Sequence, residues 1–243
     1  SIYQNNYEED EETVRSFTNN ILKVEMPNTI TEIGIGTFSG YDHGFYFDNL
    51  EKIELSKSLE SIPSLTFWGC KKLKNIEIPN NIIEIGTSAF ERCDSLEYIS
   101  IPDSVKKIHN NAFVVCKNLK TVELGNIVES SSNFEEAAFA YNDKLDSVII
   151  RNGVKKIGGN VFACYYSNET PIFYGSKFST IIIPDSVSQI ESGAFYDSSI
   201  ENITIPKNVS TIESGTFNNC KNLQCINLPE GLKKICTSAF EKC

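Results

Sequence analysis

Residues 73 to 95 read LKNIEIPNNIIEIGTSAFERCDS, and residues 96 to 118 read LEYISIPDSVKKIHNNAFVVCKN. The same frame returns at residues 200 to 222, which read IENITIPKNVSTIESGTFNNCKN. Written generally, the frame is L-x-x-I-x-I-P-x-x-V-x-x-I-x-x-x-A-F-x-x-C-x-x. Self-similarity at a fixed period of about 23 residues is the signature of a repeat protein. The sequence therefore predicts a solenoid, in which each unit forms one coil and stacks on its neighbours.

One phenylalanine recurs in every unit, so the number of these phenylalanines gives the number of coils. Successive ones are separated by 29, 23, 23, 26, 23, 33, 22 and 23 residues, which predicts nine coils. We expect a single solenoid domain over residues 21–243, preceded by an acidic cap or tail over residues 1–20. No polar capping segment follows the last unit, so we expect the natural protein to continue beyond Cys243. The repeat phenylalanines are Phe38, Phe67, Phe90, Phe113, Phe139, Phe162, Phe195, Phe217 and Phe240.

Each part of the unit predicts a local structure. The L-x-x-I-x-I part alternates with period two, so its apolar side chains should enter the coil while their neighbours face solvent. Proline follows in six units, and because it lacks a backbone N–H it ends the strand and turns the chain. The V-x-x-I part predicts a second short strand, and the phenylalanine should fill the coil interior. The prolines are Pro27, Pro79, Pro102, Pro184, Pro206 and Pro229.

The I-P step and the A-F-x-x-C ending resemble BspA-type leucine-rich repeats over about residues 21–243. The resemblance implies a β-rich leucine-rich-repeat solenoid with right-handed coils of about 23 residues. Short parallel strands would form a continuous sheet on one side, with short turns or 3-10 helix on the other. Local departures put individual turns in question: Ser56, Gly125 and Arg151 replace the proline, and Gly40, Asn142, residues 163–165 and Ser198 interrupt the cysteine motif.

Charge and hydropathy exclude two classes of partner. The formal net charge is −10, only three of the 22 basic residues are arginine, and the basic residues do not cluster. A nucleic-acid surface needs clustered Lys and Arg, so we expect no nucleic-acid binding. No apolar run approaches the roughly 18 residues that a membrane span requires. The chain starts at Ser1 with nothing that resembles a signal peptide; a removed leader and a trimmed chain both fit, so the compartment stays open.

Five cysteines stand three residues after a repeat phenylalanine. One interpretation is a ladder of disulfides or metal ligands, and the other is a small buried core residue that recurs with the coil. Equivalent positions in stacked coils point their Cβ atoms the same way, whereas a disulfide needs them to converge. Zinc sites need close C-x-x-C pairs, which are absent from the sequence. We therefore expect eight reduced thiols, no metal, and a reducing or anaerobic habitat. The five are Cys70, Cys93, Cys116, Cys220 and Cys243.

The sequence offers no catalytic constellation. His109 takes the place that Gly86 has in the preceding unit, which favours a turn residue. His43 lies in an insertion, where a metal ligand is the alternative interpretation. Glycines 34 to 40 suggest a phosphate loop, but they overlap the repeat and open no long helix. We expect no enzyme activity and no cofactor.

The outward position of each first strand supplies the candidate binding site. Coil by coil it is acidic in the first half and neutral to apolar in the second: Glu25, Glu54, Glu77, Ser100, Glu123, Ile149, Ile182, Thr204 and Asn227. Two aromatic insertions, residues 41–47 and 165–174, leave the same edge of the stack. We predict a protein-binding patch of Ile149, Ile182, Tyr166 and Tyr174, flanked by Glu25, Glu54, Glu77 and Glu123, which select a basic partner. The alternative is that isoleucine merely suits a strand and that the insertions pack on the core.

Three classes of function remain open. The resemblance implies a non-enzymatic protein-binding module at the cell surface or secreted, which attaches to host or neighbouring-cell proteins. A structural spacer that holds another domain away from a surface is the second class. A carbohydrate-binding or catalytic site in an inserted loop is the third.

Overall fold

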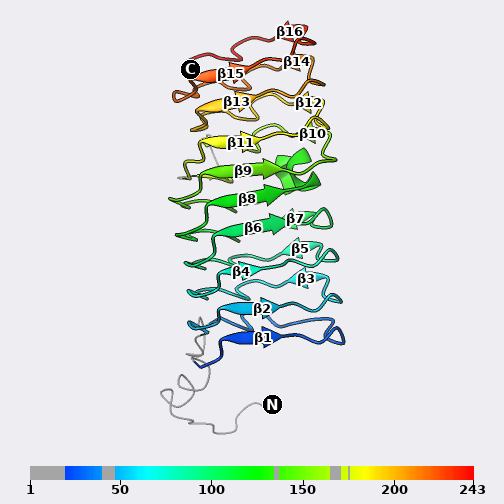
Figure 1. Cartoon of the computed structure of the whole chain (residues 1–243), viewed down its shortest axis with the longest axis vertical. Coiled ribbons are helices and arrows are strands. Elements are labelled where there is room, and N and C mark those ends of the chain that lie inside the picture. The colour runs from blue at the N-terminus through cyan, green and yellow to red at the C-terminus, as the bar shows by residue number, and fades with distance from the viewer. Residues whose placement is uncertain (1–19, 40–46, 134–136, 165–170, 175) are drawn as a thin grey trace, which may run out of the picture.

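The chain winds into a column of stacked coils around one core (Figure 1). The computed structural model describes residues 20–39, 47–133, 137–164, 171–174 and 176–243. Within these ranges, one short strand from each predicted repeat contributes to a front sheet, and these strands define coils 1 to 9. In order they are β1 (Lys23–Glu25), β2 (Lys52–Glu54), β4 (Asn75–Ile76), β6 (Tyr98–Ile101), β8 (Thr121–Leu124), β9 (Ser147–Ile150), β11 (Thr180–Ile182), β13 (Asn202–Thr204) and β15 (Cys225–Asn227).

The front sheet is parallel and in register, as the resemblance implied. Its hydrogen-bonded ladder has two sections on the same side of the column, β1-β2-β4 and β6-β8-β9-β11-β13-β15, with a division between β4 and β6. Equivalent repeat positions therefore lie opposite each other, so that Glu25 pairs with Glu54 and Ile149 pairs with Ile182. A property of one repeat position thus becomes a row along the column.

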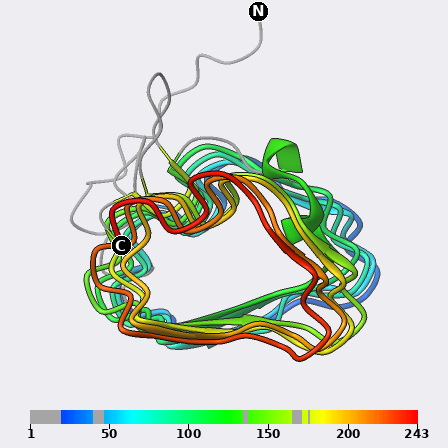
Figure 2. The same ribbon diagram turned by 90° about the horizontal axis from the view of Figure 1, so that it is seen from above.

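The V-x-x-I part forms the second short strand that the sequence predicted in seven of the nine coils, and in coil 1 the corresponding residues form no strand. In coil 5 a 3-10 helix, η1 (Asn126–Glu129), followed by η2 (Ser131–Asn133), takes its place and projects from the stack (Figure 2). Ile127 and Val128 of η1 are buried, and the Val128 carbonyl accepts a hydrogen bond from Gly158 N at 2.9 Å. None of the helices in the described ranges is long and apolar enough to cross a membrane. The second strands are β3 (Ser61–Ile62), β5 (Glu84–Ile85), β7 (Lys107–Ile108), β10 (Lys156–Ile157), β12 (Gln189–Ile190), β14 (Thr211–Ile212) and β16 (Lys234–Ile235).

The turn after each first strand survives two of the replacements of proline. In coil 4 the Pro102 carbonyl accepts a hydrogen bond from Val105 N at 3.1 Å, which closes a four-residue turn. The Ser56 and Gly125 carbonyls accept the equivalent bond at 3.3 Å. Ser56 also donates through Oγ to the Ile30 carbonyl of the preceding coil at 2.6 Å, so its hydroxyl is satisfied although buried. These two departures from the repeat keep the turn.

The repeat phenylalanines stack in a column at the centre of the core. The Phe90 and Phe113 rings, for example, are parallel with centroids 4.9 Å apart. Phe173, from the second insertion, enters this column between Phe139 at 5.3 Å and Phe162 at 5.7 Å. The Phe139 N–H donates a hydrogen bond to the Ile172 carbonyl, just as the Phe90 N–H donates to the Ala112 carbonyl of the next coil. The described end of this insertion is therefore an extra layer of the core.

Candidate interaction surface

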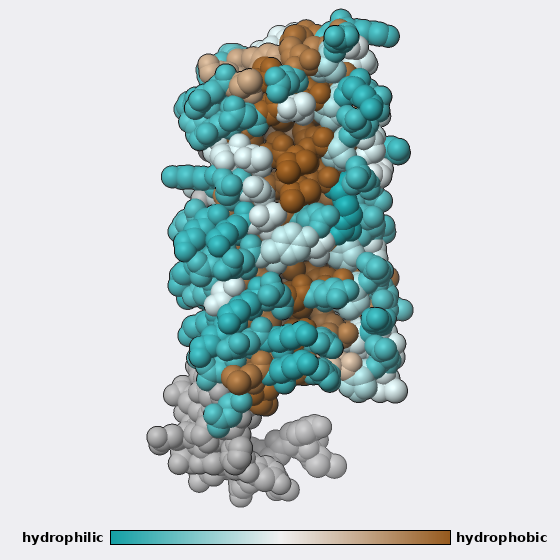
Figure 3. Space-filling model, in the orientation of Figure 1, coloured by the Kyte–Doolittle hydropathy of each residue, from teal (hydrophilic) through white to brown (hydrophobic). Residues whose placement is uncertain are grey.

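The front face, meaning the outward side chains of the front sheet, follows the predicted alternation. In β2 the Ile53 side chain is buried while Lys52 and Glu54 are exposed. In β11 the Ile181 side chain is buried while Thr180 and Ile182 are exposed. Figure 3 shows hydrophilic side chains over much of this face and a hydrophobic area over β9 and β11.

In coils 1 and 2 the predicted glutamates carry their own cations. Lys52 Nζ lies 2.7 Å from Glu54 Oε1, Lys23 Nζ lies 3.8 Å from the same oxygen, and Lys23 also contacts Glu25. The hydrogen bond and charge of Lys52, followed by the charge of Lys23, lower the pKa of Glu54. This end of the front face is therefore a mosaic of both signs, and it is less acidic than the glutamate row alone suggests.

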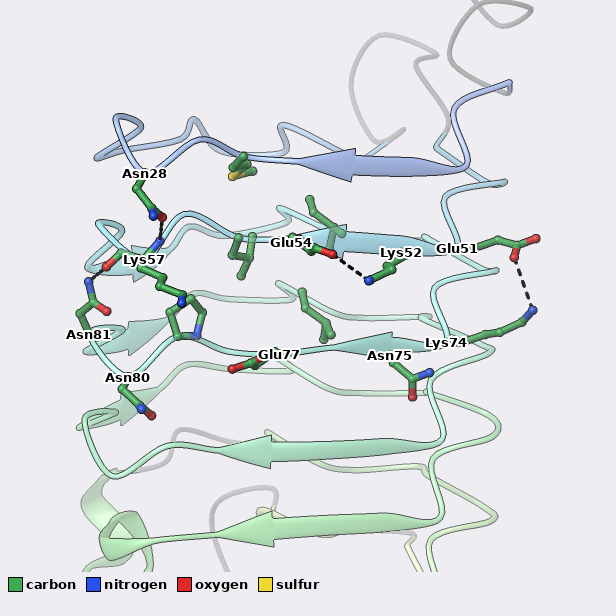
Figure 4. Close-up of a pocket in the computed structure, with 15 residues that line it drawn as sticks. Asn28, Glu51, Lys52, Glu54, Lys57, Lys74, Asn75, Glu77, Asn80 and Asn81 are labelled. Atoms are coloured by element: carbon green, nitrogen blue, oxygen red, sulfur yellow. Dashed lines mark hydrogen bonds and ion pairs between the residues drawn. The ribbon is translucent and has the colours of Figure 1, made fainter.

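A shallow depression of about 900 Å³ lies over coils 1 to 3 (Figure 4). Its polar side chains mainly bind one another or the adjoining turns. Asn28 Oδ1 accepts a hydrogen bond from Lys57 N at 2.9 Å, and Lys74 Nζ lies 3.5 Å from Glu51 Oε2. Within the described residues, no group of three or more His, Cys, Asp or Glu could hold a metal ion. The depression offers polar groups of both signs and no reactive constellation.

Arg151 holds a polar cluster across coils 4 to 6, a role that the sequence analysis missed. Its Nε lies 3.2 Å from Glu123 Oε1, its Nη1 lies 3.7 Å from Asp103 Oδ1, and it donates a hydrogen bond to Ser100. The Tyr98 hydroxyl donates to the other oxygen of Glu123. Burial opposes the charge of Glu123, but hydrogen bonds from Tyr98, Ser100 and Arg151 outweigh it, and the pKa of Glu123 is lowered. The one feature of the sequence that could have indicated this role is that Arg151 replaces the proline of the repeat.

Gly125 makes room for this cluster. A Cβ atom at Gly125 would lie 1.7 Å from Asp103 Oδ1. That oxygen accepts a hydrogen bond from Asn126 N at 3.2 Å and also faces Arg151. Any larger residue at position 125 would have to displace the Asp103 side chain from both partners.

The structure brings two of the predicted patch residues together. Ile149 and Ile182 are direct neighbours in the pairing of β9 with β11, and Glu123 precedes them in the same row. Ile149 is half-buried, whereas the Ile182 side chain is 53% exposed. Single exposed isoleucines are ordinary, but two in adjacent strands make a continuous apolar strip.

The predicted tyrosines lie elsewhere or outside the described residues. The Tyr141 N–H donates to the Tyr174 carbonyl at 2.7 Å, so Tyr174 lies along the turn after the repeat phenylalanine and away from the front sheet. The two tyrosine rings form an edge-to-face pair with centroids 5.4 Å apart, and both are exposed. Tyr166, His43 and residues 41–46 lie outside the described residues. The isoleucine pair and Tyr174 thus belong to different sides of the coil.

The cysteine ladder has a structural role that neither interpretation from the sequence contained. Each thiol donates to the carbonyl of the repeat phenylalanine in the preceding coil; for Cys116 and Phe90 the distance is 3.2 Å. Burial raises the pKa of the Cys116 thiol to about 12 and that of Cys220 to about 11. All eight cysteines are free. In coil 5, where the motif lapses, Asn142 Nδ2 donates to the Phe113 carbonyl at 3.0 Å in place of a thiol.

These repeats match a known family. The model of the BspA type leucine rich repeat region matches residues 41–169 and 169–243, with six copies. The chain belongs to the BspA-type leucine-rich repeat family. Repeats of this kind generally serve as protein-interaction or surface modules and are generally not catalytic.

The chain is similar to several solved structures of bacterial leucine-rich repeat proteins. A leucine-rich repeat protein from Bacteroides ovatus is 24% identical, over 93% of this chain and 77% of that one, with a TM-score of 0.36. A leucine rich cell surface protein from Faecalibacterium prausnitzii is 27% identical, over 85% and 47%, with a TM-score of 0.45, so this chain spans about half of it. The Treponema pallidum leucine rich repeat protein is 24% identical, over 88% and 73%, with a TM-score of 0.40. No curated protein matches the chain.

Proposed function

We propose that the chain is a non-enzymatic protein-binding module whose binding surface is the front face of coils 4 to 9. The observation that carries the proposal is the outward-facing isoleucine pair, the half-buried Ile149 and the exposed Ile182, in the middle of a regular parallel sheet. An outward isoleucine has no packing role in the coil, and an apolar strip framed by polar side chains suits a protein partner. The cell-surface or secreted location that the family implies is part of this proposal, as is a role in adhesion.

The fixed cluster beside the strip supports the same surface. Tyr98 and Arg151 are of the residue types that most often dominate binding energy at interfaces. Arg151 is held by Glu123 and Asp103, so it would lose little side-chain freedom on binding. Because Glu25, Glu54 and Glu123 already have cationic partners, selection of a basic partner becomes the weaker part of the prediction.

The test is an array of purified extracellular-matrix and cell-surface proteins, probed with the wild-type chain and with the double variant Ile149→Glu, Ile182→Glu. We expect at least one array protein to bind the wild-type chain, and the double variant to bind it at least tenfold more weakly, since two charges would be desolvated at the contact. The matched control is Ile83→Glu, because Ile83 is exposed to a similar degree but lies outside the front sheet. All three proteins should melt at nearly the same temperature.

Two outcomes would contradict the proposal. Equal binding by the wild-type chain and the double variant would move the site away from the front face, and the exposed Tyr141–Tyr174 pair would be the next surface to test. Absence of binding to any array protein would favour the spacer function, for which a regular column that displays no ligand is sufficient.

A further inference from the structure

The six-stranded section of the front sheet has an outward surface that is nearly free of charge. Its one charged residue, Glu123, is paired with Arg151 at 3.2 Å. Depletion of charge is typical of the core of a protein interface rather than of open surface. The outward residues, two from each of coils 4 to 9, are Tyr98, Ser100, Thr121, Glu123, Ser147, Ile149, Thr180, Ile182, Asn202, Thr204, Cys225 and Asn227.

We propose that this face binds a second copy of the same chain, front face to front face. The inference rests on the proposed function and names its partner. The two-fold axis runs parallel to the strands and passes between β9 and β11, so the two columns are antiparallel. Coil 6 of one copy then lies on coil 7 of the other, coil 5 on coil 8, and coil 4 on coil 9. Such an interface is isologous, the commonest arrangement in homodimers.

This axis matches the outward residues row by row. In the row of the isoleucines, Ile149 meets Ile182 of the second copy, and Glu123 meets Thr204, whose hydroxyl can donate a hydrogen bond to it. In the other row, Ser147 meets Thr180, and Tyr98 meets the exposed Cys225. Apolar groups face apolar groups, and no two like charges meet.

A two-fold axis parallel to the column can bring apolar groups together or keep like charges apart, but it cannot do both. An axis parallel to the column sets every coil on itself. If that axis follows the isoleucine row, each of the row's four glutamates meets its own copy, and like charges in contact are unfavourable. If the axis is shifted to lie between the two outward rows, the glutamates no longer meet each other. Ile149 then meets Ser147 of the second copy, and the contact between isoleucines is lost. The antiparallel arrangement avoids both faults because it never sets a coil on its own copy, so no glutamate of the row meets itself while Ile149 still meets Ile182. The four are Glu25, Glu54, Glu77 and Glu123.

The residues immediately before the strands support the same axis. The antiparallel arrangement places Lys120 of coil 5 opposite Glu201 of coil 8, and Asp146 of coil 6 opposite Ser179 of coil 7. Lys120 and Glu201 are both exposed and of opposite sign, although Lys120 Nζ also lies 2.9 Å from Glu97 Oε2 of its own chain, so the contact would be shared between two carboxylates. An axis parallel to the column reverses the strands, so on the isoleucine row it would instead set Lys120 against Asn126 of the same coil, which carries no charge.

The expected affinity is low. Six strands spaced by about 4.8 Å span about 24 Å, and three residues of strand span about 10 Å. That footprint is well below the roughly 800 Å² per partner of a stable dimer, so the dissociation constant should lie between micromolar and millimolar. A weak contact of this kind gains strength when many copies are displayed together.

The decisive test uses Cys225, the exposed cysteine of the front face. In a Cys236→Ser, Cys243→Ser background, Tyr98→Cys places a thiol that should meet Cys225 of the second copy. A short bismaleimide added at high protein concentration should then give a covalent dimer on a denaturing gel. Adding Cys225→Ser to this variant should abolish the dimer, and Ile83→Cys in place of Tyr98→Cys should give none. A covalent dimer from Cys225 alone would indicate coil-on-coil packing and overturn the proposed axis.

Sedimentation equilibrium up to about 1 mM protein supplies the second measurement. The wild-type chain and Ile83→Glu should show reversible dimers, and Ile182→Glu should raise the dissociation constant at least tenfold. A wild-type chain that stays monomeric would overturn the second-copy inference. If that monomer still bound an array protein through Ile149 and Ile182, the proposed function would stand without it. A chain that dimerises yet binds no array protein would leave self-association as the only function of the face.

Discussion

At the scale of the residue, the cysteine ladder is a ladder of hydrogen-bond donors. Cys93 Sγ lies 3.3 Å from the Phe67 carbonyl, and the same contact recurs in the coils that carry the motif. Asn142 replaces the thiol with an amide, and Ser198, also buried at a cysteine position, lies 3.4 Å from Cys220 Sγ. These positions therefore share a side chain that can donate a proton, and in the cysteine coils the sulfur also fills the space.

Cys93→Ala tests this interpretation. The alanine removes the donor and leaves the buried carbonyl with one hydrogen bond fewer, so the free energy of unfolding should fall by about 1–2 kcal/mol. Cys93→Ser keeps a donor and should lose less than half as much. Urea denaturation of the three proteins measures the difference. Equal losses for alanine and serine would mean that the sulfur acts only by filling volume.

The buried thiols also predict a loss of stability at alkaline pH. Burial raises the pKa of Cys116 from its ordinary value near 9 to about 12. Between these values the unfolded chain releases the thiol proton while the folded chain holds it, so stability is complete below pH 9 and falls as pH rises. Each such thiol contributes up to about 1.4 kcal/mol per pH unit in this window. Cys116→Ser should flatten the decline between pH 9 and 11.

The control for the alkaline experiment is the exposed Cys225, whose replacement by serine should leave the slope unchanged. The same samples test the redox state: denatured under non-reducing conditions, the chain should titrate close to eight thiols. A value near zero would show that the thiols are oxidised in the protein as isolated. The predicted loss of stability at alkaline pH would then also be wrong, because it requires free thiols.

At the scale of the element, the second insertion is partly a core element. Phe173 is fully buried and stacks between Phe139 and Phe162, while its neighbour Tyr174 is 39% exposed. Phe173→Ala should therefore cost about 3–5 kcal/mol, the usual penalty for a buried phenylalanine. Tyr174→Ala, the matched control one residue away, should cost less than about 1 kcal/mol. Thermal or urea unfolding measures both losses of stability. Equal small losses would contradict the core role of Phe173 and indicate that the insertion is a surface loop.

At the scale of the whole molecule, each coil contacts its neighbours, so stability should be close to a sum of local terms. Phe113 lies between Phe90 and Phe139 and is fully buried, whereas Phe240 of coil 9 stacks on Phe217 and is only half-buried. Phe113→Ala should cost about 3–5 kcal/mol. Phe240→Ala in the chain of residues 1–243 should cost much less, because Phe240 is only half-buried, and hydrogen exchange of this chain should be fastest in coil 9. Equal costs would indicate a single closed core.

Periodicity alone was enough to determine the coil, its first strand, the second strand of every coil but coils 1 and 5, and the inward face. Each of these depends on residues within one repeat, so Ile53 or Phe113 can be placed inside from the pattern. The outward row was determined in the same way, and the pairing of Ile149 with Ile182 followed from the register.

Other features were decided only by the tertiary structure, because they join residues whose spacing the repeat does not set. Arg151 reaches Ser100, 51 residues away, and thereby neutralises Glu123. Phe173 doubles back to enter the column before Phe162, an order that no linear pattern contains. Tyr174 was separated from the isoleucines by the same rearrangement. Within a repeat, local periodicity directs each side chain; between repeats, packing and charge pairing across coils decide which surface remains free.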